Sequence, residues 1–555
     1  MKDELKSFYA AVLLSLGVVF LSNFLFSDKK ENIEEPQPVV ETAVAETPKT
    51  LTENNEALPQ ENLPTEEILI SSQRVDIDNS SLKGSIRANG GRIDNLWLKK
   101  YKQTLDVDSA DVELFAPTKS ANPYYAEFGW LASDKNLKLP NSDTLWTIKG
   151  DKLTPETPVV LEWDNGEGLR FITKFSVDDD YMFNIDQYVE NNTDKSVTLY
   201  PYGLIARNQE KPMGASVVHE GPIGVFDEEL EEVKYSDLKK ENKEFESNGG
   251  WFGFSDRYWF SSIIINSKQK IKAKFSRNDT FYQTDYVGAP VNISAGTVGS
   301  AQEMLYAGAK EIKLLDKYTD ELHINKFDLA VDFGWYYFLT KPFFYILDFL
   351  YNLIGNMGWA ILLFATLLRL AMFPIANKSF ENMAKMKKLQ PKLKELQDKF
   401  AEDKMKLQQE TVLLYQKEKV NPASGCLPMF IQIPVFFSLY KVLNIAIEIR
   451  HAPFIGWIKD LSAPDPMVIS AWSHLPIPGF LDIGVWPIVM GLTMFIQQKM
   501  NPAPTNKDQA RAFALMPLIF TFMMGHFAAG LVIYWSFSNL LAIIQQRAIL
   551  IKNKA

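Results

Sequence analysis

The sequence predicts a polytopic α-helical membrane protein with six transmembrane helices and one large all-β domain outside the membrane. Three observations support this fold class. Long apolar runs lie near both ends of the 555-residue chain. Between them, a polar middle alternates apolar and polar residues with a period of two, as half-buried strands do. Lysine and arginine gather in alternate loops between the apolar runs, which is the positive-inside pattern of membrane proteins.

The composition argues against several kinds of site. Cys426 is the only cysteine, which rules out an intramolecular disulfide framework and a thiolate metal site. The five histidines are scattered, and none lies at metal-ligand spacing from another. The sequence contains no phosphate-binding or dinucleotide-binding glycine motif, no HExxH and no GxSxG. We therefore expect no enzyme activity, no catalytic residue, no metal and no cofactor. The net charge of −10 says little about nucleic acids, because charge is segregated along the chain.

The amino-terminal residues 1–26 are predicted to form a signal-anchor transmembrane helix. An apolar run at 8–26 follows Lys2 and Lys6 and is long enough to span ~30 Å of hydrocarbon. The alternative is a cleaved signal peptide, but the run exceeds the usual apolar core and leads to no Ala-x-Ala site. Residues 27–66 are rich in Glu, Pro, Thr and Asn, and we expect a disordered acidic linker there.

Residues 67–333 are predicted to form one β-sandwich. Alternating stretches such as 169–177 and 181–189 are separated by Gly, Asn and Asp residues, which is typical of antiparallel strands. Aromatic residues cluster between Trp251 and Phe260, either as a carbohydrate-binding cleft or as sandwich core. We favour the core.

From residue 334 on, the sequence predicts one interfacial helix and five further transmembrane helices. Residues 334–355 are aromatic but contain Lys341 and Asp348, so an amphipathic helix in the membrane interface fits better than a span. The predicted transmembrane helices 2 to 6 cover residues 356–377, 423–447, 483–500, 512–529 and 530–549.

Loop charge sets the orientation of these helices. Residues 378–422 contain eleven lysines, and the loop at 501–511 and the tail at 550–555 are also basic. The loop at 448–482 offers only Arg450 and Lys459. By the positive-inside rule both termini are cytoplasmic, whereas the β domain and the loop at 448–482 lie outside.

The basic segment at 378–422 is predicted to be a cytoplasmic helical hairpin. Apolar residues spaced three or four apart form a stripe from Met383 to Phe400, and lysines occupy the other faces. These lysines are solvated, meet anionic lipid headgroups or bind RNA; we favour the first two.

Arg369 is a charged residue inside a predicted span and needs an explanation. It lies about eight residues from the cytoplasmic end of its span, where a charge costs ~2.5–3.5 kcal/mol on insertion scales. Either its side chain snorkels to the headgroups or it lies in a water-filled cavity, which we favour. The polar residues that could line such a cavity are Thr366, Gln432, Thr521, Tyr534 and Ser538.

A solvated cation in a cavity open to the cytoplasm would draw acidic segments of another molecule part-way into the membrane. A membrane potential that is positive outside would then help to carry an acidic segment across, by ~2.3 kcal/mol per charge per 100 mV.

Several short motifs, in this order on this topology, resemble one known family. They are DFGW (332–335), Arg369, KMKKLQPK (385–392), Tyr415 with Asn421-Pro422, GCLPMFIQIP (425–434), EIRHAPF (448–454), WIKDLS (457–462), Asp465-Pro466, QKMNP (498–502), GLVIY (530–534) and SNL (538–540). The chain is similar over nearly its whole length to the YidC family of membrane protein insertases, in the Gram-negative form with a large periplasmic domain.

The resemblance implies an amphiphilic five-helix insertase core in the bacterial inner membrane and a periplasmic β-supersandwich like that of galactose mutarotases. Nascent membrane proteins would enter a hydrophilic groove that contains Arg369 and leave sideways along spans three and five into the membrane lipids. The basic hairpin would contact ribosomes and targeting factors through Lys385, Lys387, Lys388, Lys392 and Lys394. The protein would also act as a membrane chaperone beside the Sec translocon and its accessory Sec proteins, without sequence-specific binding of nucleic acid.

Three details depart from the family pattern. Thr366 precedes Arg369 by three residues, while Ala365 stands four residues before it; His526 takes the place of an aromatic residue near the last turn. Residues 467–483 are longer than the usual approach to span four. Two other functions stay open: a solute channel or transporter with a ligand-binding β domain, and a carbohydrate-active β domain on a membrane anchor.

Overall fold

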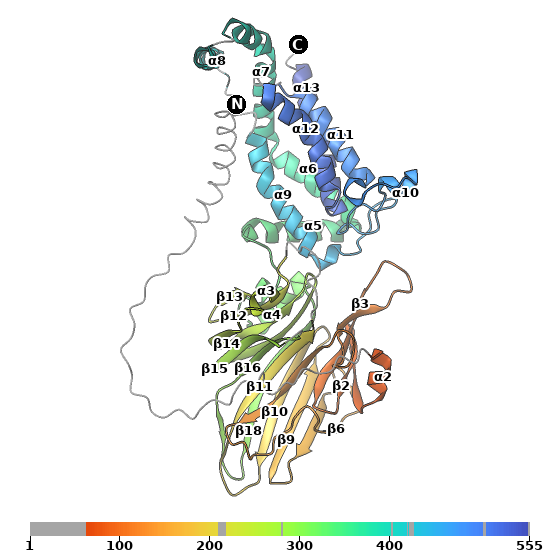
Figure 1. Cartoon of the computed structure of the whole chain (residues 1–555), viewed down its shortest axis with the longest axis vertical. Coiled ribbons are helices and arrows are strands. Elements are labelled where there is room, and N and C mark those ends of the chain that lie inside the picture. The colour runs from red at the N-terminus through yellow and green to blue at the C-terminus, as the bar shows by residue number, and fades with distance from the viewer. Residues whose placement is uncertain are drawn as a thin grey trace, which may run out of the picture. The chain divides into compact units, whose positions relative to one another are not determined.

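A computed structural model describes residues 63–208, 218–278, 281–400, 403–418, 420, 427–502 and 507–552. The predicted signal-anchor helix at 1–26 and nearly all of the linker at 27–66 lie outside these residues. The described chain contains a strand-rich part, which ends near residue 333, and a helical part that follows it (Figure 1).

The strand-rich part is a β-sandwich, as predicted, and it also contains short helices. Its elements are α2 (Thr65–Ile70), β1 (Arg74–Asp78), β2 (Leu82–Arg87), β3 (Arg92–Lys102), β4 (Asp111–Phe115), β5 (Tyr124–Ala132), β6 (Thr147–Lys149), β7 (Lys152–Leu153), β8 (Val159–Asp164), β9 (Leu169–Val177), β10 (Met182–Asn191), β11 (Val197–Asn208), β12 (Gly221–Phe226), β13 (Glu229–Glu232), α3 (Tyr235–Leu238), β14 (Lys243–Ser255), β15 (Trp259–Asn278), β16 (Phe281–Val287), β17 (Val291–Ile293), β18 (Val298–Ala309), α4 (Ile312–Glu321) and η2 (Phe327–Ala330).

These strands form one hydrogen-bonded sheet that folds into two layers. One layer contains β7, β1, β2, β3, β5, β11 and β16 in this order. The other contains β6, β8, β9, β10 and β18. Strand β15 belongs to both, because residues 259–264 pair with β18 and residues 272–278 pair with β16. The pair β1 and β7 is parallel, and the other described pairs are antiparallel.

A bulge lets the β14–β15 hairpin pass from one layer to the other. The register of β14 shifts between Asn248 and Gly250. Gly250 has φ +120°, and a Cβ atom there would lie 2.1 Å from the carbonyl oxygen of Val225. Only glycine fits this position, since it has no side chain and tolerates positive φ.

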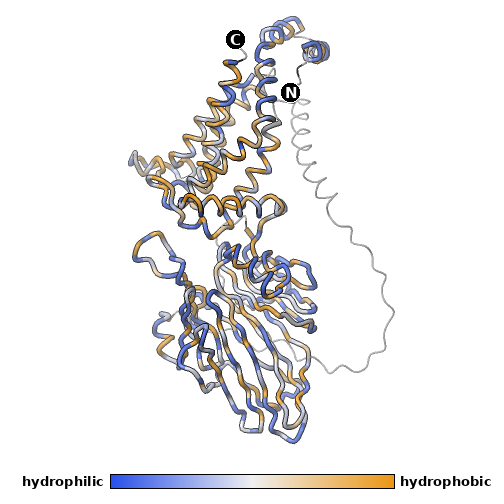
Figure 2. The backbone as a smooth tube through the Cα atoms, turned by 180° about the vertical axis from the view of Figure 1, so that it is seen from behind, coloured by the Kyte–Doolittle hydropathy of each residue, from blue (hydrophilic) through white to orange (hydrophobic). Residues whose placement is uncertain are grey.

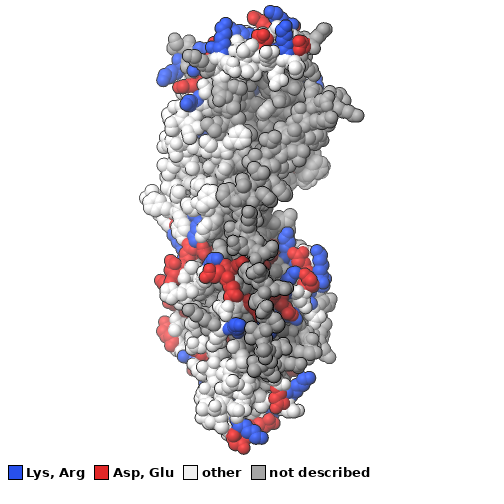
Figure 3. All heavy atoms as spheres, turned by 90° about the vertical axis from the view of Figure 1, so that its left-hand side faces the viewer, with Lys and Arg blue, Asp and Glu red and all other residues white. Residues whose placement is uncertain are grey.

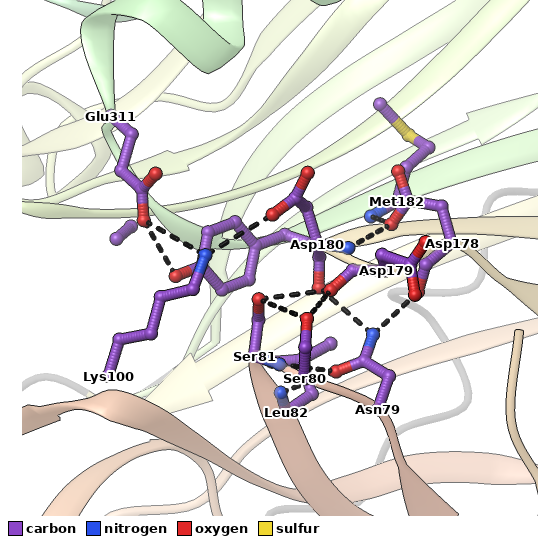
Figure 4. Close-up of polar contacts among 12 residues, drawn as sticks. Asn79, Ser80, Ser81, Leu82, Lys100, Asp178, Asp179, Asp180, Met182 and Glu311 are labelled. Atoms are coloured by element: carbon purple, nitrogen blue, oxygen red, sulfur yellow. Dashed lines mark hydrogen bonds and ion pairs between the residues drawn. The ribbon is translucent and has the colours of Figure 1, made fainter.

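Polar contacts join the two layers at one end of the sandwich (Figure 4). Asn79 and Ser81, between β1 and β2, donate to the backbone carbonyls of Asp178 (2.6 Å) and Asp179 (3.0 Å), between β9 and β10. From β3, the Lys100 ammonium lies 3.2 Å from the Asp180 carboxylate and 3.9 Å from that of Glu311. The turns between the strands are thereby held in a fixed geometry.

The aromatic cluster near Trp251 is part of the core. Trp251, Phe252, Phe254 and Phe260 are fully buried, and Tyr258 is nearly so. The Trp251 ring meets the ring of Phe327 from η2 edge-on at 5.6 Å. These side chains therefore pack the sandwich, and the core interpretation was correct.

One carboxyl group is buried between the layers. Glu303 on β18 accepts a hydrogen bond from the Tyr286 hydroxyl of β16 (2.5 Å) and another from the Gln187 amide of β10 (3.2 Å). Burial raises the pKa of Glu303 from 4.5 to about 7. The folded domain thus holds a proton on Glu303 that the unfolded chain releases at lower pH.

This proton makes the stability of the β-sandwich depend on pH. Because the folded-state pKa is the higher one, the free energy of unfolding should fall as the pH rises from about 4.5 to 7, by about 3 kcal/mol from this group. In Glu303→Gln this loss should disappear. The pH dependence of the free energy of unfolding can be measured by thermal unfolding of the full-length protein between pH 5 and about 8, with near-ultraviolet circular dichroism as the signal. The same pH slope in both proteins would contradict the prediction.

The helical part continues the chain directly from the sandwich. Its elements are α5 (Tyr337–Ile354), α6 (Met357–Ala371), α7 (Phe373–Lys399), α8 (Lys404–Lys417), α9 (Leu427–Ile445), η4 (Ile447–Ile449), α10 (Ile469–Ser473), η5 (Gly479–Leu481), α11 (Val485–Met500), α12 (Lys507–Met524) and α13 (Ala529–Lys552). Of these, α13 contacts α6, α7, α9 and α11 and lies at the centre of the packing.

Two of the differences from the predicted helix ends bear on the site. A helix predicted to run over 356–377 instead ends at Ala371, and α7 leaves it at an angle of 67°. Pro374 in the first turn of α7 has no N–H to continue the hydrogen bonds of α6, which explains the bend. The predicted turn between the last two helices is present at residues 525–528: α12 ends at Met524, before the predicted 529, and α13 begins at Ala529, close to the predicted 530.

The membrane spans themselves stay a prediction. Within the described residues, no single helix is both long and apolar enough to cross a bilayer. Taken together, the bent pair α6 and α7 is long and apolar enough to cross a bilayer. Phe430–Ile445 and Ala510–Met524 are shorter apolar helical stretches.

Charge and hydropathy nevertheless divide the helical part into zones. Its helices are mostly hydrophobic, whereas the tip formed by α7 and α8 is mostly hydrophilic (Figure 2). On the face seen in Figure 3, Lys, Arg, Asp and Glu gather on this tip and on the strand-rich part, and the described surface between them is free of charge.

Candidate functional site

Arg369 lies in the last turn of α6, two residues before the helix ends. The sequence had placed it farther from a helix end, because the bend after Ala371 was not expected. Its side chain is half-buried, and its buried Nε atom has no hydrogen-bond partner within the described part of the chain. A guanidinium without a carboxylate needs water or an incoming acceptor as its partner.

Two of the predicted cavity residues lie together beside this arginine. The Gln432 amide of α9 donates a hydrogen bond of 2.9 Å to the Tyr534 hydroxyl of α13. Tyr534 is also an electrostatic neighbour of Arg369. Three helices, α6, α9 and α13, thus bring one polar group each to the same place.

The other three predicted residues are placed differently. The Thr366 hydroxyl, one turn before Arg369, donates to the carbonyl of Leu362 (2.9 Å). Ser538 is half-buried one turn after Tyr534. Thr521 lies against α11: its hydroxyl donates to the Pro517 carbonyl (2.7 Å), and a Cβ atom on Gly491 would meet its Oγ1 at 1.9 Å. Thr521 therefore fills a tight contact between α11 and α12.

Sequence reasoning missed most of the polar residues that organise α13. Asn539 donates to Thr493 of α11 (3.3 Å), Gln545 to Asn377 of α7 (2.8 Å), and Gln546 to Asn501 (3.0 Å). Their wide spacing along α13 gives no local signal. Hydrogen bonds of this kind fix the rotation of α13 against its neighbours.

A second polar region binds α9 to the strand-rich part. The Lys441 ammonium lies 2.7 Å from the carboxylate of Asp332, which also accepts hydrogen bonds from the backbone N–H groups of His219 and Gly334. The Arg257 guanidinium donates to the backbone and side-chain oxygens of Asn444 (2.8 and 3.1 Å). Asp332 belongs to the DFGW motif, but its partner could not be recognised from the sequence.

The pair of Lys441 and Asp332 should contribute measurably to stability, because both side chains are largely buried. A double-mutant cycle with Lys441→Met and Asp332→Asn should give a coupling free energy of about 1–2 kcal/mol in thermal unfolding of the detergent-solubilised protein. The exposed pair Lys272 and Glu246, at 3.7 Å, is the control and should show coupling near zero. Equal coupling in the two cycles would show that Lys441 is not held by Asp332.

The helix α5 is fastened to α4 and η2. Lys341 lies 2.8 Å from both Asp316 and Asp328, and the Tyr337 hydroxyl donates to Asp328 (2.7 Å). Burial alone lowers the pKa of Lys341, but these hydrogen bonds outweigh it and raise its pKa above the ordinary value. Another face of α5 is apolar and exposed, with Phe338, Phe349 and Leu353 about two-thirds accessible.

The five lysines assigned to the basic hairpin lie on exposed faces of α7. Lys385, Lys387, Lys388, Lys392 and Lys394 are all solvent-accessible. Lys392 bridges to Glu418 at 2.8 Å, and Leu389 and Leu393 are buried. The hairpin therefore has a packed apolar side and a basic outer side.

Asp465 organises the loop between α9 and α11. Its buried carboxylate accepts hydrogen bonds from the Trp457 indole (2.9 Å) and from the backbone N–H groups of Met467 (2.9 Å) and Trp486 (2.8 Å). Trp486 lies in the first turn of α11, so the carboxylate also interacts favourably with the helix dipole.

The described residues contain no group of three or more His, Cys, Asp and Glu side chains that could hold a metal ion. His526 is exposed at the turn between α12 and α13. What the Arg369 site offers is a positive charge, one tyrosine hydroxyl and one amide, which suit the binding of polar or acidic groups.

Two family models match adjacent parts of the chain. One describes the YidC periplasmic domain and matches residues 74–346. The other describes the 60Kd inner membrane protein and matches residues 349–555. The boundary between the two matches lies within α5.

Curated relatives match nearly the whole chain. A membrane protein insertase YidC from Methylobacterium nodulans is 47% identical over 92% of this chain and 87% of its own length. The protein of the same name from Beijerinckia indica is 44% identical over 99% of this chain and 96% of its own length. Among solved structures, an active YidC insertase with its first transmembrane domain resolved is 17% identical, with a TM-score of 0.37, over 85% of this chain and 91% of that one.

Proposed function

This chain belongs to the YidC family of membrane protein insertases, and we propose that it inserts nascent proteins into the bacterial inner membrane. Nascent chains enter a hydrated groove at Arg369 that is open to the cytoplasm and to lipid. Their helices then leave laterally along α9 and α12 into the bilayer. The protein works alone or as a chaperone beside the Sec translocon and its accessory Sec proteins.

The observation that carries this proposal is the state of Arg369. Its buried Nε has no partner in the described residues, yet it lies beside Gln432 and Tyr534 among helices whose other side chains are mostly apolar. Keeping a charge in such surroundings is costly unless water or a ligand solvates it. An acidic or polar segment of a client would provide this solvation while it passes.

We propose that both termini are cytoplasmic and that the sandwich is periplasmic. Six spans cross the membrane, comprising the segment at 1–26, α6 with the start of α7, α9, α11, α12 and α13. The charge-free surface in Figure 3 supports the crossing, and the basic residues of α7 support the orientation. The apolar face of α5 then lies in the outer interface of the bilayer.

The basic hairpin is proposed to receive the client from the ribosome or from targeting factors. Its exposed lysines, carried by α7, lie at the cytoplasmic side in this orientation. Ribosomal RNA and anionic lipid headgroups both attract such a face through charge, without sequence readout. The apolar side of the hairpin, with the buried residues Leu389 and Leu393, stays packed while the exposed basic side meets them.

Crosslinking to a translating ribosome tests the proposed path. In a Cys426→Ser background, single cysteines at Phe437 of α9 and Leu518 of α12 would carry a photoactivatable benzophenone. A ribosome-bound membrane protein of intermediate length should crosslink at both positions. Leu492 of α11 is the matched control, because it is 58% exposed, close to the 56% of Leu518, yet lies off the proposed path.

Two outcomes of this crosslinking experiment would contradict the proposed path. Absence of crosslinks to α9 and α12, with the protein correctly folded, would rule out insertion by this path. Equal crosslinking at Leu492 and Leu518 would mean that the client contacts the protein without a defined exit.

A further inference from the structure

The loop before α11 is closed on itself by hydrogen bonds. Val468 and Gly484 form an isolated antiparallel bridge, and the Ile469 N–H donates to the Ile483 carbonyl (3.1 Å). The Asp482 carboxylate accepts hydrogen bonds from the backbone and hydroxyl groups of Ser470. With Asp465 bound to the N–H groups of Met467 and Trp486, the two ends of residues 467–483, the "outer loop", are held together.

The tip of this outer loop is apolar and exposed. Residues 467–481 contain no Asp, Glu, Lys or Arg. Leu475 is 61% exposed, Leu481 is 37% exposed, and Pro476 and Pro478 are exposed as well. A leucine side chain left in water is less stable than one in an apolar environment. A fixed, uncharged loop that presents such a tip indicates that something apolar covers it.

The surroundings of the loop favour lipid over a protein partner. In both Figure 1 and Figure 2 the α10 segment protrudes sideways from the helices. It continues into α11, whose exposed residues Ile488 and Leu492 are apolar too. A protein interface would be expected to carry polar groups at its rim, whereas this tip has only His474 as a titratable side chain. Leucine, present here as the exposed residues Leu475 and Leu481, is among the residues by which interfacial segments enter the headgroup region.

We propose that the tip of the outer loop, carried by Leu475, inserts into the periplasmic leaflet of the bilayer beside α11. The inference rests on the proposed membrane crossing of α11. It adds a lipid-binding surface that is separate from the client path and from α5. Because Asp465 and Asp482 keep the loop closed, insertion of its tip fixes the depth of the outer end of α11.

Nitroxide quenching tests the depth of the tip. Leu475→Cys would be labelled with the fluorophore NBD in a Cys426→Ser background, in vesicles of phosphatidylethanolamine and phosphatidylglycerol. Lipids with a nitroxide near the headgroup should quench its emission at least twofold, and more than lipids with the nitroxide near the chain end. Val298→Cys on the sandwich is the matched control, since Val298 is 60% exposed, and it should not be quenched.

Leu492→Cys, in the middle of α11, separates the possible outcomes. Quenching at Leu492→Cys without quenching at Leu475→Cys would overturn the loop inference and leave the proposed function standing. A blue shift of the NBD emission at Leu475→Cys without quenching would mean that protein covers the tip. This result would also overturn the loop inference. Lack of quenching at both sites would overturn the membrane placement of α11, and the loop inference with it.

A charged tip provides an independent check. With NBD at Ile477→Cys, the added substitution Leu475→Glu should reduce headgroup quenching at least twofold, because a carboxylate resists entry into the leaflet. The isosteric change Leu475→Met should leave the quenching unchanged. Equal quenching in the Glu and Met variants would contradict insertion of the tip.

Discussion

Replacing Arg369 with glutamate is expected to abolish insertion of client proteins whose translocated segment is acidic, while Arg369→Lys keeps most of it. At ~6 Å and an effective dielectric constant of ~20, each attraction to a client carboxylate is worth about 2–3 kcal/mol. Reversal of the charge turns this attraction into repulsion, and the occupancy of the groove by an acidic segment should fall by at least about 100-fold. Insertion into inverted membrane vesicles, scored by protease protection of the client, measures the effect.

The side chain at 369 can be changed without breaking a described hydrogen bond, because its buried Nε has no partner. We therefore expect Arg369→Lys, Arg369→Ala and Arg369→Glu to unfold at similar temperatures. Arg369→Ala should be intermediate in insertion, and a client with a neutral translocated segment should depend on Arg369 far less. If Arg369→Glu inserts acidic clients as well as the unchanged protein, the arginine does not contact them and the groove mechanism is wrong.

How far the sequence could predict this site is clear from its three central residues. Arg369 could be singled out, because it is a charge in an otherwise apolar run. Gln432 and Tyr534 could be named as polar residues in apolar segments, but their hydrogen bond joins residues 102 positions apart on different helices. Periodicity reports which face of a helix is apolar and not which helix it meets. Thr521 shows the same limit, since its contact with Gly491 of α11 could not be recognised from its own segment.

The β-sandwich shows the same limit at a larger scale. The alternating stretch at 169–177 is strand β9, and that at 181–189 coincides with β10 to within two residues at each end. These boundaries follow from local pattern and turn residues. The passage of the β14–β15 hairpin between the layers depends on the bulge at Gly250 and on pairing with β16 and β18, which are tertiary events. Likewise, a proline two residues into α7 ends α6 early, in a run whose hydropathy alone continues to residue 377.

Removal of the carboxylate of Asp465 is expected to destabilise the outer end of the helical part more than other single changes in that loop. In Asp465→Ala, the Trp457 indole and the N–H groups of Met467 and Trp486 all lose their acceptor. Each buried donor left unpaired costs about 1–3 kcal/mol, and the half-exposed indole can turn to water, so the sum should be about 2–4 kcal/mol. Thermal unfolding in detergent measures this loss.

The variant Asp465→Asn is the matched control, because it keeps the size of the side chain and one of its two acceptor oxygens. It should lose about half as much stability, since one N–H donor remains paired and the favourable charge at the start of α11 is gone. If Asp465→Asn is as unstable as Asp465→Ala, the charge itself holds the loop. In that case high salt should not destabilise the unchanged protein, because Asp465 is only 3% exposed and a buried charge interaction is little screened. Insertion activity at Arg369 should persist in both variants wherever the protein is still folded, since the described contacts of Arg369, Gln432 and Tyr534 do not include this loop.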